Sequence, residues 1–221
     1  MSGAAAGSDA VTVVLVRHGE TPLTPHGAYS GSGVPGPSLT DIGRRQAHAA
    51  ARLTYRIGRS LFDDVPSPSA LLTSPMVRTQ ETAAVVGERL GLAPTIEARA
   101  RECDFGDWEG LRPADIDARW PGERALWHTD GTIPAPGGGE STAAVGVRTE
   151  EMLSDLYQQY AGSTVVVVAH AVSIRAMVGR ALLAPPGAWW RFRLLPASTT
   201  VLRRQEDTFT QLLGVGLPGE E

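Results

Sequence analysis

The sequence predicts an α/β fold with three layers, in which helices cover both faces of a mostly parallel sheet. Residues 11–16 (VTVVLV) and 164–169 (TVVVVA) form two continuous apolar runs that are rich in valine. Runs of this kind are typical of strands buried on both faces, as in a parallel sheet. The stretches between and after them carry apolar residues at helical spacing, and strands that alternate with helices favour an α/β architecture.

The segment after the first strand predicts a loop and then a helix. Residues 28–38 (AYSGSGVPGPS) have the composition of a loop. Thr40 can cap a helix that runs to about residue 58. One face of this helix is apolar at helical spacing and comprises Ala47, Ala50, Leu53 and Ile57.

A second helix is expected to begin at Ser74, because serine is a good N-cap and Pro75 suits the first helical position. A short strand ends just before it, at residues 71–72. The helix should run to about Leu90, where Gly91 can close it.

The second half of the chain continues the alternation. We expect residues 100–139 to be irregular, residues 141–160 to form a helix, and residues 172–183 to form another helix after the second strand. The tail over residues 189–213 is strand-like. The length of 221 residues suits one domain over residues 11–221, after a disordered lead-in over residues 1–10.

Charge and composition exclude several functional classes. The formal net charge of -4 gives no reason to expect a nucleic-acid partner, which usually requires a basic face. No apolar run approaches the roughly 18 residues of a membrane span, and the N-terminus lacks the features of a signal peptide. The single cysteine excludes an intramolecular disulfide. A cytoplasmic location is therefore the default expectation, and a homodimer stays open.

All 20 cationic residues are arginines. The absence of lysine excludes a Schiff-base lysine, a P-loop and a protein-kinase site. An anionic ligand must then be held by arginine, histidine or backbone N–H groups, and arginine matches phosphate geometry well. The five histidines (18, 26, 48, 128 and 170) show no zinc-like spacing, so no metal is expected.

Both apolar strands end in a histidine, His18 and His170. Ligands in open α/β sheets bind beyond the carboxyl ends of the strands, so the two histidines are expected to share a site. Arg17 precedes His18, and Gly19 lets the chain turn there. A hydrogen-bonded sheet edge would explain the Arg-His pair equally well, and a lone His170 is more often a satisfied core histidine.

Arg78 lies near the start of its predicted helix, where a cation opposes the helix dipole. A bound anion would resolve this conflict, although an ion pair with a nearby acid such as Glu81 would also do so. The segment 102–110 (ECDFGDWEG) could supply a carboxyl group for proton transfer. Composition alone does not choose among its four acids, which are Glu102, Asp104, Asp107 and Glu109.

Taken in order, these segments resemble the histidine phosphatase superfamily, the phosphoglycerate-mutase-like proteins. The resemblance rests on RHGET (17–21), SPMVRTQETA (74–83), ECDFGDWEG (102–110) and the late strand-end His170. PGGGES (136–141) adds to it. It extends over about residues 11–201 and is closest to the short branch that includes α-ribazole phosphatases and broad acid phosphatases.

The resemblance implies a role for each matching residue. His18 would attack phosphorus, while Arg17, Arg78 and His170 would bind the phosphoryl oxygens. Glu102 matches the proton donor of the family. Departures occur at Thr24, where the family often has asparagine, at Ala171, where it usually has glycine, and at Ala28, where a basic residue is common. The hydroxyl of Thr24 and the N–H of Ala171 can still bind phosphate.

A lid over about residues 103–139 is also implied, and the functions of its Trp120, Trp127 and His128 stay open beside simple packing. The activity implied is that of a metal-independent phosphomonoesterase that needs no cofactor and acts on a small phosphorylated metabolite. A phosphoglycerate mutase that depends on 2,3-bisphosphoglycerate is an alternative, although the interval from Glu102 to His170 is short for one. A phosphoprotein phosphatase and a phosphate-binding module are further alternatives.

Overall fold

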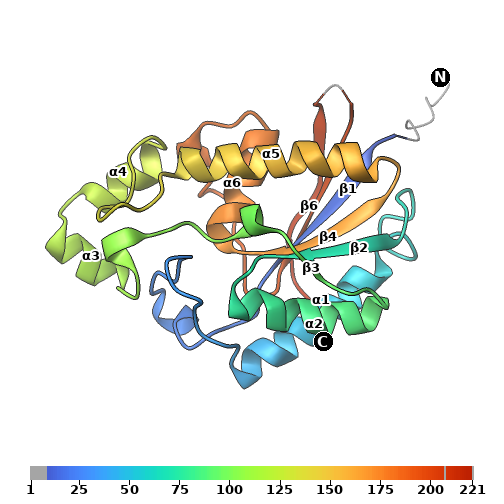
Figure 1. Ribbon diagram of the computed structural model, residues 1–221, viewed down its shortest axis with the longest axis horizontal. Helices are drawn as coiled ribbons and strands as arrows, with labels where there is room; N and C mark the ends of the chain where they lie inside the picture. The colour runs from blue at the N-terminus through green and yellow to red at the C-terminus, as the bar shows by residue number, and fades with distance from the viewer. Residues whose placement is uncertain (1–8, 207, 221) are drawn as a thin grey trace.

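The computed structural model describes residues 9–206 and 208–220, so most of the expected N-terminal lead-in (1–8) lies outside the described residues. Within these ranges the strands form one sheet in the order β3-β2-β4-β1-β5-β6 (Figure 1). Their bounds are β1 Val11–Arg17, β2 Pro68–Thr73, β3 Thr95–Ile96, β4 Thr164–Ala169, β5 Thr199–Arg204 and β6 Thr210–Leu217.

The sheet is parallel from β3 to β1 and antiparallel at β5 and β6. Helices α1 (Asp41–Arg56) and α2 (Val77–Leu90) cover one face, and α5 (Thr142–Tyr160) and α6 (Ala171–Ala181) cover the other (Figure 1). The three-layer α/β fold expected from the two valine-rich runs is therefore confirmed.

Alternate residues of β1 build the two cores on either side of the sheet. Val13 and Leu15 pack in the cluster that includes Met177 of α6, whereas Val14 and Val16 pack in the cluster that includes Val86 of α2. Side chains of a strand point alternately to its two faces, so a strand that is apolar throughout can serve both cores. The same alternation holds along β4.

Most of the capping residues recognised in the sequence lie at the ends of helices in the structure. The Thr40 hydroxyl accepts a hydrogen bond from the Gly43 N–H, as an N-cap does. Gly91 closes α2 with a left-handed φ of 70°, which a glycine adopts at little cost. Ser141 caps α5 in the same way as Thr40 caps α1.

The expected start of α2 at Ser74 is wrong, because the helix begins at Val77 with Met76 at the N-cap. Residues 74–76 are not helical. The Ser74 hydroxyl contacts the ring of His170, with 2.7 Å between Oγ and Nε2. The Ser74 hydroxyl therefore binds the strand-end histidine, and it also accepts from the N–H of Met76, the N-cap of α2, at 3.4 Å.

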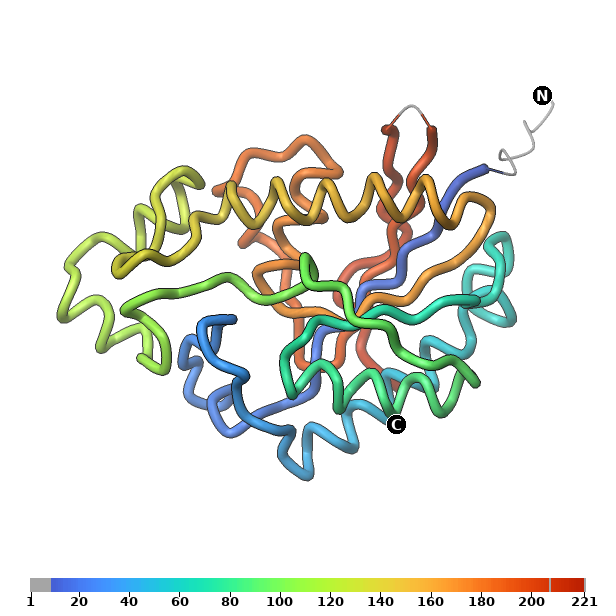
Figure 2. Tube along the Cα trace, viewed as in Figure 1, coloured from blue at the N-terminus to red at the C-terminus, as the bar shows by residue number. Residues whose placement is uncertain are grey.

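The segment over residues 100–139, expected to be irregular, contains two short α-helices at the end of the molecule that lies beyond the sheet (Figure 2). These are α3 (Pro113–Arg119) and α4 (Glu123–Thr129). The tail also differs from expectation, because residues 189–198 are turns and the strands β5 and β6 follow them. The remaining helical turns are the 3-10 segments η1 Thr24–His26, η2 Ala98–Ala100, η3 Gly106–Trp108 and η4 Pro186–Ala188.

Within the described ranges, no helix combines the length and the apolarity that crossing a bilayer requires.

Candidate active site

The pairing of β1 with β4 brings the two strand-end histidines together. The register places Arg17 opposite Ala169, and the His18 N–H donates to the Ala169 carbonyl at 3.0 Å. The next residues of both strands therefore leave the sheet side by side. The rings of His18 and His170 meet edge to face with their centroids 5.2 Å apart, so the expectation of a shared location is met.

A hydrogen bond to the backbone carbonyl of the next residue, Gly19, fixes the tautomer of His18. Its Nδ1 lies 2.7 Å from the Gly19 carbonyl oxygen. A carbonyl oxygen can only accept, so Nδ1 carries the proton and Nε2 carries the free lone pair. Burial, followed by the positive charges of Arg78 and Arg17, lowers the pKa of His18 well below its ordinary value. The ring is therefore a neutral base at neutral pH.

His170 is fully buried and is fixed at both ring nitrogens. The Nε–H of Arg78 donates to His170 Nδ1 at 3.2 Å. Nδ1 is therefore the acceptor, and Nε2–H donates to the Ser74 hydroxyl at 2.7 Å. Burial, and then the charge of Arg78, lowers the pKa of His170 well below its ordinary value. His170 packs behind His18 as a neutral ring with a fixed orientation.

Arg78 is also fully buried, and it connects the histidines to the loop after η1. Its Nη2 donates to the carbonyls of Ser30 and Gly31 at 2.8 and 3.3 Å, while Nη1 is buried without a partner among the described residues. Gly36 leaves room for this nitrogen, because a Cβ there would lie 2.3 Å from Nη1. The guanidinium lies beside both rings and forms no ion pair with an acid among the described residues, although the charges of Glu102 and Glu109 act on it.

A cavity of about 180 Å³ opens in front of His18. Five of the residues expected in the site line it, and these are Arg17, His18, Thr24, Glu102 and Ala171. Arg78 and His170 are not among its lining residues and lie behind His18. Burial lowers the pKa of Arg17 to about 10, and its Nη1 donates to the Leu194 carbonyl at 2.7 Å.

Glu102 is the acid that the structure places at the cavity. The residue is only 5% exposed, and its carboxylate accepts hydrogen bonds from the backbone N–H groups of Val172 and Ser173, both at 3.2 Å. These groups belong to the first turn of α6, where a negative charge is stabilised. The other three acids of the segment do not line the cavity: Asp104 accepts from the Gly106 N–H, Glu109 accepts from the Gly31 N–H, and Asp107 is exposed.

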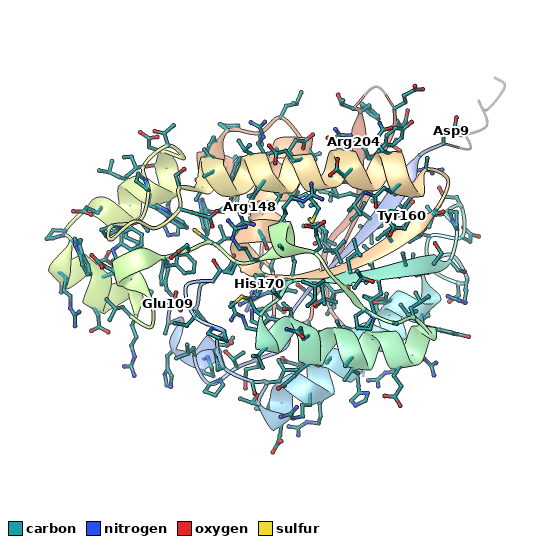
Figure 3. All side chains as sticks on the ribbon, in the orientation of Figure 1. Asp9, Glu109, Arg148, Tyr160, His170 and Arg204 are labelled. Atoms are coloured by element: carbon teal, nitrogen blue, oxygen red, sulfur yellow. The ribbon has the colours of Figure 1, made fainter. Side chains whose placement is uncertain are left out.

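Arg148 of α5 and Glu140 hold the chain on both sides of Glu102, and sequence reasoning did not identify them. Arg148 donates to the carbonyls of Arg99, Arg101 and Glu102 at 2.6, 2.9 and 3.1 Å. It also forms a largely buried ion pair with Glu140 at 2.9 Å. Figure 3 shows Arg148 reaching from α5 toward this extended chain.

Arg175 is a further cavity residue that the sequence reasoning missed. It lies four residues after Ala171 on α6, so both face the same side of the helix, and this spacing was the available signal. Its guanidinium lies over the Trp190 ring, 5.4 Å from the centroid. The cavity wall is completed by aromatic rings from three segments, which are Tyr29, Phe105, Trp127 and Trp190.

The remaining expected residues have defined positions. The Thr24 hydroxyl accepts from the Thr21 N–H at 3.0 Å. Trp127 is buried in the core that also contains Trp108, and Trp120 packs against this core. His128 contacts the Tyr29 hydroxyl at 3.2 Å, and burial lowers the pKa of His128 to about 4. Most of the lid aromatics therefore pack with one another.

Together these groups form a site for chemistry on an anionic electrophile. A neutral imidazole nitrogen faces a cavity, arginines supply positive charge, and a carboxyl group lies on the same wall. In the part of the chain that the structure describes, no cluster of three or more histidine, cysteine and acidic side chains could hold a metal ion.

Known proteins resemble this chain over most of its length. The family model described as histidine phosphatase superfamily (branch 1) matches residues 13–214. The structure of mycobacterial glucosyl-3-phosphoglycerate phosphatase, in complex with VO3, superimposes with a TM-score of 0.81 at 32% identity, over 93% of this chain and 99% of that one. A candidate alpha-ribazole-5'-P phosphatase of Escherichia coli gives a TM-score of 0.74 at 26% identity, over 96% and 99%.

A Mycobacterium tuberculosis protein named as bifunctional is 35% identical over 189 residues, which are 86% of this chain but only 49% of that protein. The chain thus spans about half the length of this curated relative and of two further mycobacterial relatives that match it equally. The family model nevertheless matches nearly the whole chain, with the two strand-end histidines inside the matched region. The chain therefore belongs to branch 1 of the histidine phosphatase superfamily.

Proposed function

We propose that this chain hydrolyses the phosphomonoester of a small metabolite through a phosphohistidine intermediate on His18. The observation that carries the proposal is the tautomer of His18. Its Nδ1–H is committed to the Gly19 carbonyl at 2.7 Å, so the lone pair on Nε2 is free to attack. The lowered pKa keeps the ring unprotonated and therefore nucleophilic at neutral pH.

In the first step, His18 Nε2 forms a bond to phosphorus while the bond between phosphorus and the leaving oxygen breaks. The carboxyl group of Glu102, on the same cavity wall, gives a proton to that oxygen. In the second step, Glu102 takes a proton from water, whose oxygen attacks phosphorus. The P–N bond then breaks, which releases inorganic phosphate and restores His18.

The positive charges around His18 support this chemistry. Arg17 and Arg78 stabilise the negative charge that spreads over the phosphoryl oxygens in the transition state. The N–H of Ala171, at the first turn of α6, and the Thr24 hydroxyl are offered to the same oxygens. His170 orients Arg78 through the hydrogen bond at 3.2 Å and contacts the nucleophile ring.

The substrate class follows from the size of the cavity and from the relatives. A cavity of about 180 Å³ suits a small phosphorylated metabolite. The similar structures are named for glucosyl-3-phosphoglycerate and alpha-ribazole-5'-P, which are small phosphomonoesters. We extend the proposal to action in the cytoplasm, which rests on composition alone.

The test is hydrolysis of p-nitrophenyl phosphate in the presence of EDTA by the wild type, His18→Ala and the control His48→Ala, whose histidine is exposed on α1. Removal of a nucleophile costs on the order of 10⁴-fold or more in kcat, so His18→Ala should be inactive. His48→Ala should match the wild type. A radiolabelled phosphate should appear on the wild type in an acid-labile, alkali-stable form.

Turnover that survives His18→Ala would contradict the proposal. Wild-type turnover that stops in EDTA would contradict its metal independence. Interconversion of phosphoglycerates that needs 2,3-bisphosphoglycerate, faster than release of phosphate, would identify a mutase.

A further inference from the structure

Three arginines at the active site, the fully buried Arg78 and the partly exposed Arg17 and Arg175, differ from the buried arginines elsewhere in the described chain. Burial lowers the pKa of Arg17, Arg78 and Arg175. None of the three forms an ion pair with an acid among the described residues. Buried arginines elsewhere do, as Arg148 does with Glu140 and Arg204 with Glu150.

Unpaired buried charges are costly unless a ligand compensates them. A phosphoryl group bound at His18 compensates Arg17 and Arg78 in the proposed function. Arg175 lines the same cavity, and although the charge of Glu102 acts on it, no ion pair joins the two side chains. A guanidinium at the cavity without an ion pair can bind a further negative charge on the substrate.

Neighbouring groups hold the guanidinium of Arg175 in place, but its hydrogen-bonding capacity is not fully used. Its Nη1 and Nη2 reach the carbonyls of Ala171 and Phe192 only at 3.5 and 3.3 Å. Its Nε is buried with no partner among the described residues. The rings of Trp190 and Phe192 lie against the group, 5.4 and 5.9 Å from their centroids, and fix its plane.

We propose that Arg175 binds a carboxylate on the substrate, so that the natural substrates are phosphomonoesters of small hydroxy acids. This inference rests on the proposed function and adds a substrate class to it. A planar guanidinium pairs with a carboxylate through two parallel hydrogen bonds. The surrounding aromatic rings of Tyr29, Trp127 and Trp190 give the pair a cavity wall of low polarity and contact the carbon chain of the substrate.

The test compares two substrates that differ only in the second anion, phosphoglycolate and ethyl phosphate. We expect the wild type to have a higher kcat/KM for phosphoglycolate. Arg175→Gln should lower the ratio of the two kcat/KM values by roughly 10- to 100-fold, the usual effect of removing hydrogen bonds between charged groups. The matched control is Arg180→Gln, an exposed arginine of the same helix, which should keep the wild-type ratio.

An equal loss on both substrates in Arg175→Gln would overturn the inference, because it would show a general role in phosphoryl transfer. A wild type that shows no preference for the acid would overturn it as well, as would a stronger preference for propane-1,3-diol bisphosphate. Hydrolysis of p-nitrophenyl phosphate, which carries no carboxylate, distinguishes failure of the carboxylate site from failure of the proposed function. Normal turnover that depends on His18 keeps the proposed function when the carboxylate site fails, whereas its absence removes both.

Discussion

The strand-end region around His18 and His170 differs in what determines its geometry from residues 103–139, the segment that was expected to form a lid and is called the lid segment below. In the strand-end region, parallel pairing of β1 with β4 places the two histidines, so backbone hydrogen bonds set the arrangement. In the lid segment, packing of aromatic side chains does so, since Phe105, Trp108 and Trp127 share one core. Glu102 lies at the junction, tied to α6 by its side chain and to Arg148 by its carbonyl.

This difference separates two kinds of catalytic group. The proposed nucleophile, His18, belongs to the sheet edge, whereas the position of the proposed proton donor, Glu102, depends on contacts between segments that are distant in the sequence. Changes in the junction should therefore affect proton transfer selectively, whereas changes in the strand-end region should affect all substrates alike.

Glu102→Gln should have the largest effect of these changes. A general acid contributes about 10²- to 10⁴-fold, so hydrolysis of ethyl phosphate should fall by that amount. The loss on p-nitrophenyl phosphate should be much smaller, because p-nitrophenolate leaves without a proton. The N–H groups of Val172 and Ser173 bind different oxygens of Glu102, so Gln keeps only one of these hydrogen bonds; losing the other costs about 1–3 kcal/mol, and the fold should persist. Glu102 also activates water in the second step, which both esters share, so kcat/KM is the measure of its role in the first step, and equal losses in kcat/KM would show that Glu102 is not the acid.

Arg148→Met should remove the hydrogen bonds and the ion pair that hold the chain on both sides of Glu102. Breaking a buried ion pair and leaving its partner costs about 3–5 kcal/mol in the free energy of unfolding. Activity on ethyl phosphate should fall more than activity on p-nitrophenyl phosphate, because Glu102 loses its support. Denaturant unfolding and the two kcat/KM values measure both effects.

The control for Arg148 is Arg204→Met, which breaks the ion pair with Glu150 away from the cavity. It should destabilise the protein without changing the ratio of the two activities. Arg148→Lys keeps a charge beside Glu140 and serves if the Met variant does not fold. An unchanged ratio in both Arg148 variants would show a purely structural role.

Ser74→Ala tests the strand-end region. It removes the acceptor for His170 Nε2–H and leaves a buried donor unpaired, which costs about 1–3 kcal/mol. The looser ring should lower kcat by roughly 10-fold on ethyl and p-nitrophenyl phosphate alike. Ser69→Ala, an exposed serine of β2, should behave as the wild type. A change confined to one ester would contradict the assignment of Ser74 to the strand-end region.

The smallest effect concerns stability in acid. The pKa values of His18 and His170 are lowered in the folded protein, so below about pH 6.5 the unfolded chain binds more protons than the folded one. The free energy of unfolding should therefore fall as the pH falls, by up to about 1.4 kcal/mol per pH unit for each histidine. Chemical denaturation from pH 7 to pH 5 measures the slope, and His170→Gln should reduce it. The same slope in that variant would contradict the neutral state of the ring.

The sheet and its flanking helices could be predicted from local signals. The two valine-rich runs gave β1 and β4, and the caps Thr40 and Ser141 gave the starts of α1 and α5. The helices α3 and α4 could not be predicted, because each has 7 residues and depends on the lid core for stability. The start of α2 was wrongly predicted at Ser74, because the hydroxyl of this serine binds His170, which is distant in the sequence, instead of capping the helix.

The site residues can likewise be divided into those that could be predicted from the sequence and those that could not. His18 and His170 could be placed at one sheet edge from the sequence, and the resemblance selected Glu102 from four acids. The lid-side partners could not be found in this way, because Arg148 acts through Glu140 and backbone carbonyls, which leave no pattern in the sequence. The catalytic roles assigned to these residues remain predictions.

Cys103, the residue after Glu102, can report on local opening of the structure around the active site. Cys103 is the only cysteine of the chain, its side chain is fully buried, and burial raises the pKa of its thiol well above the ordinary value. A thiol in this state reacts with alkylating probes only when the surrounding structure opens. The labelling rate of the unmodified protein therefore measures how often the chain beside Glu102 opens, and a ligand that closes the cavity should slow it.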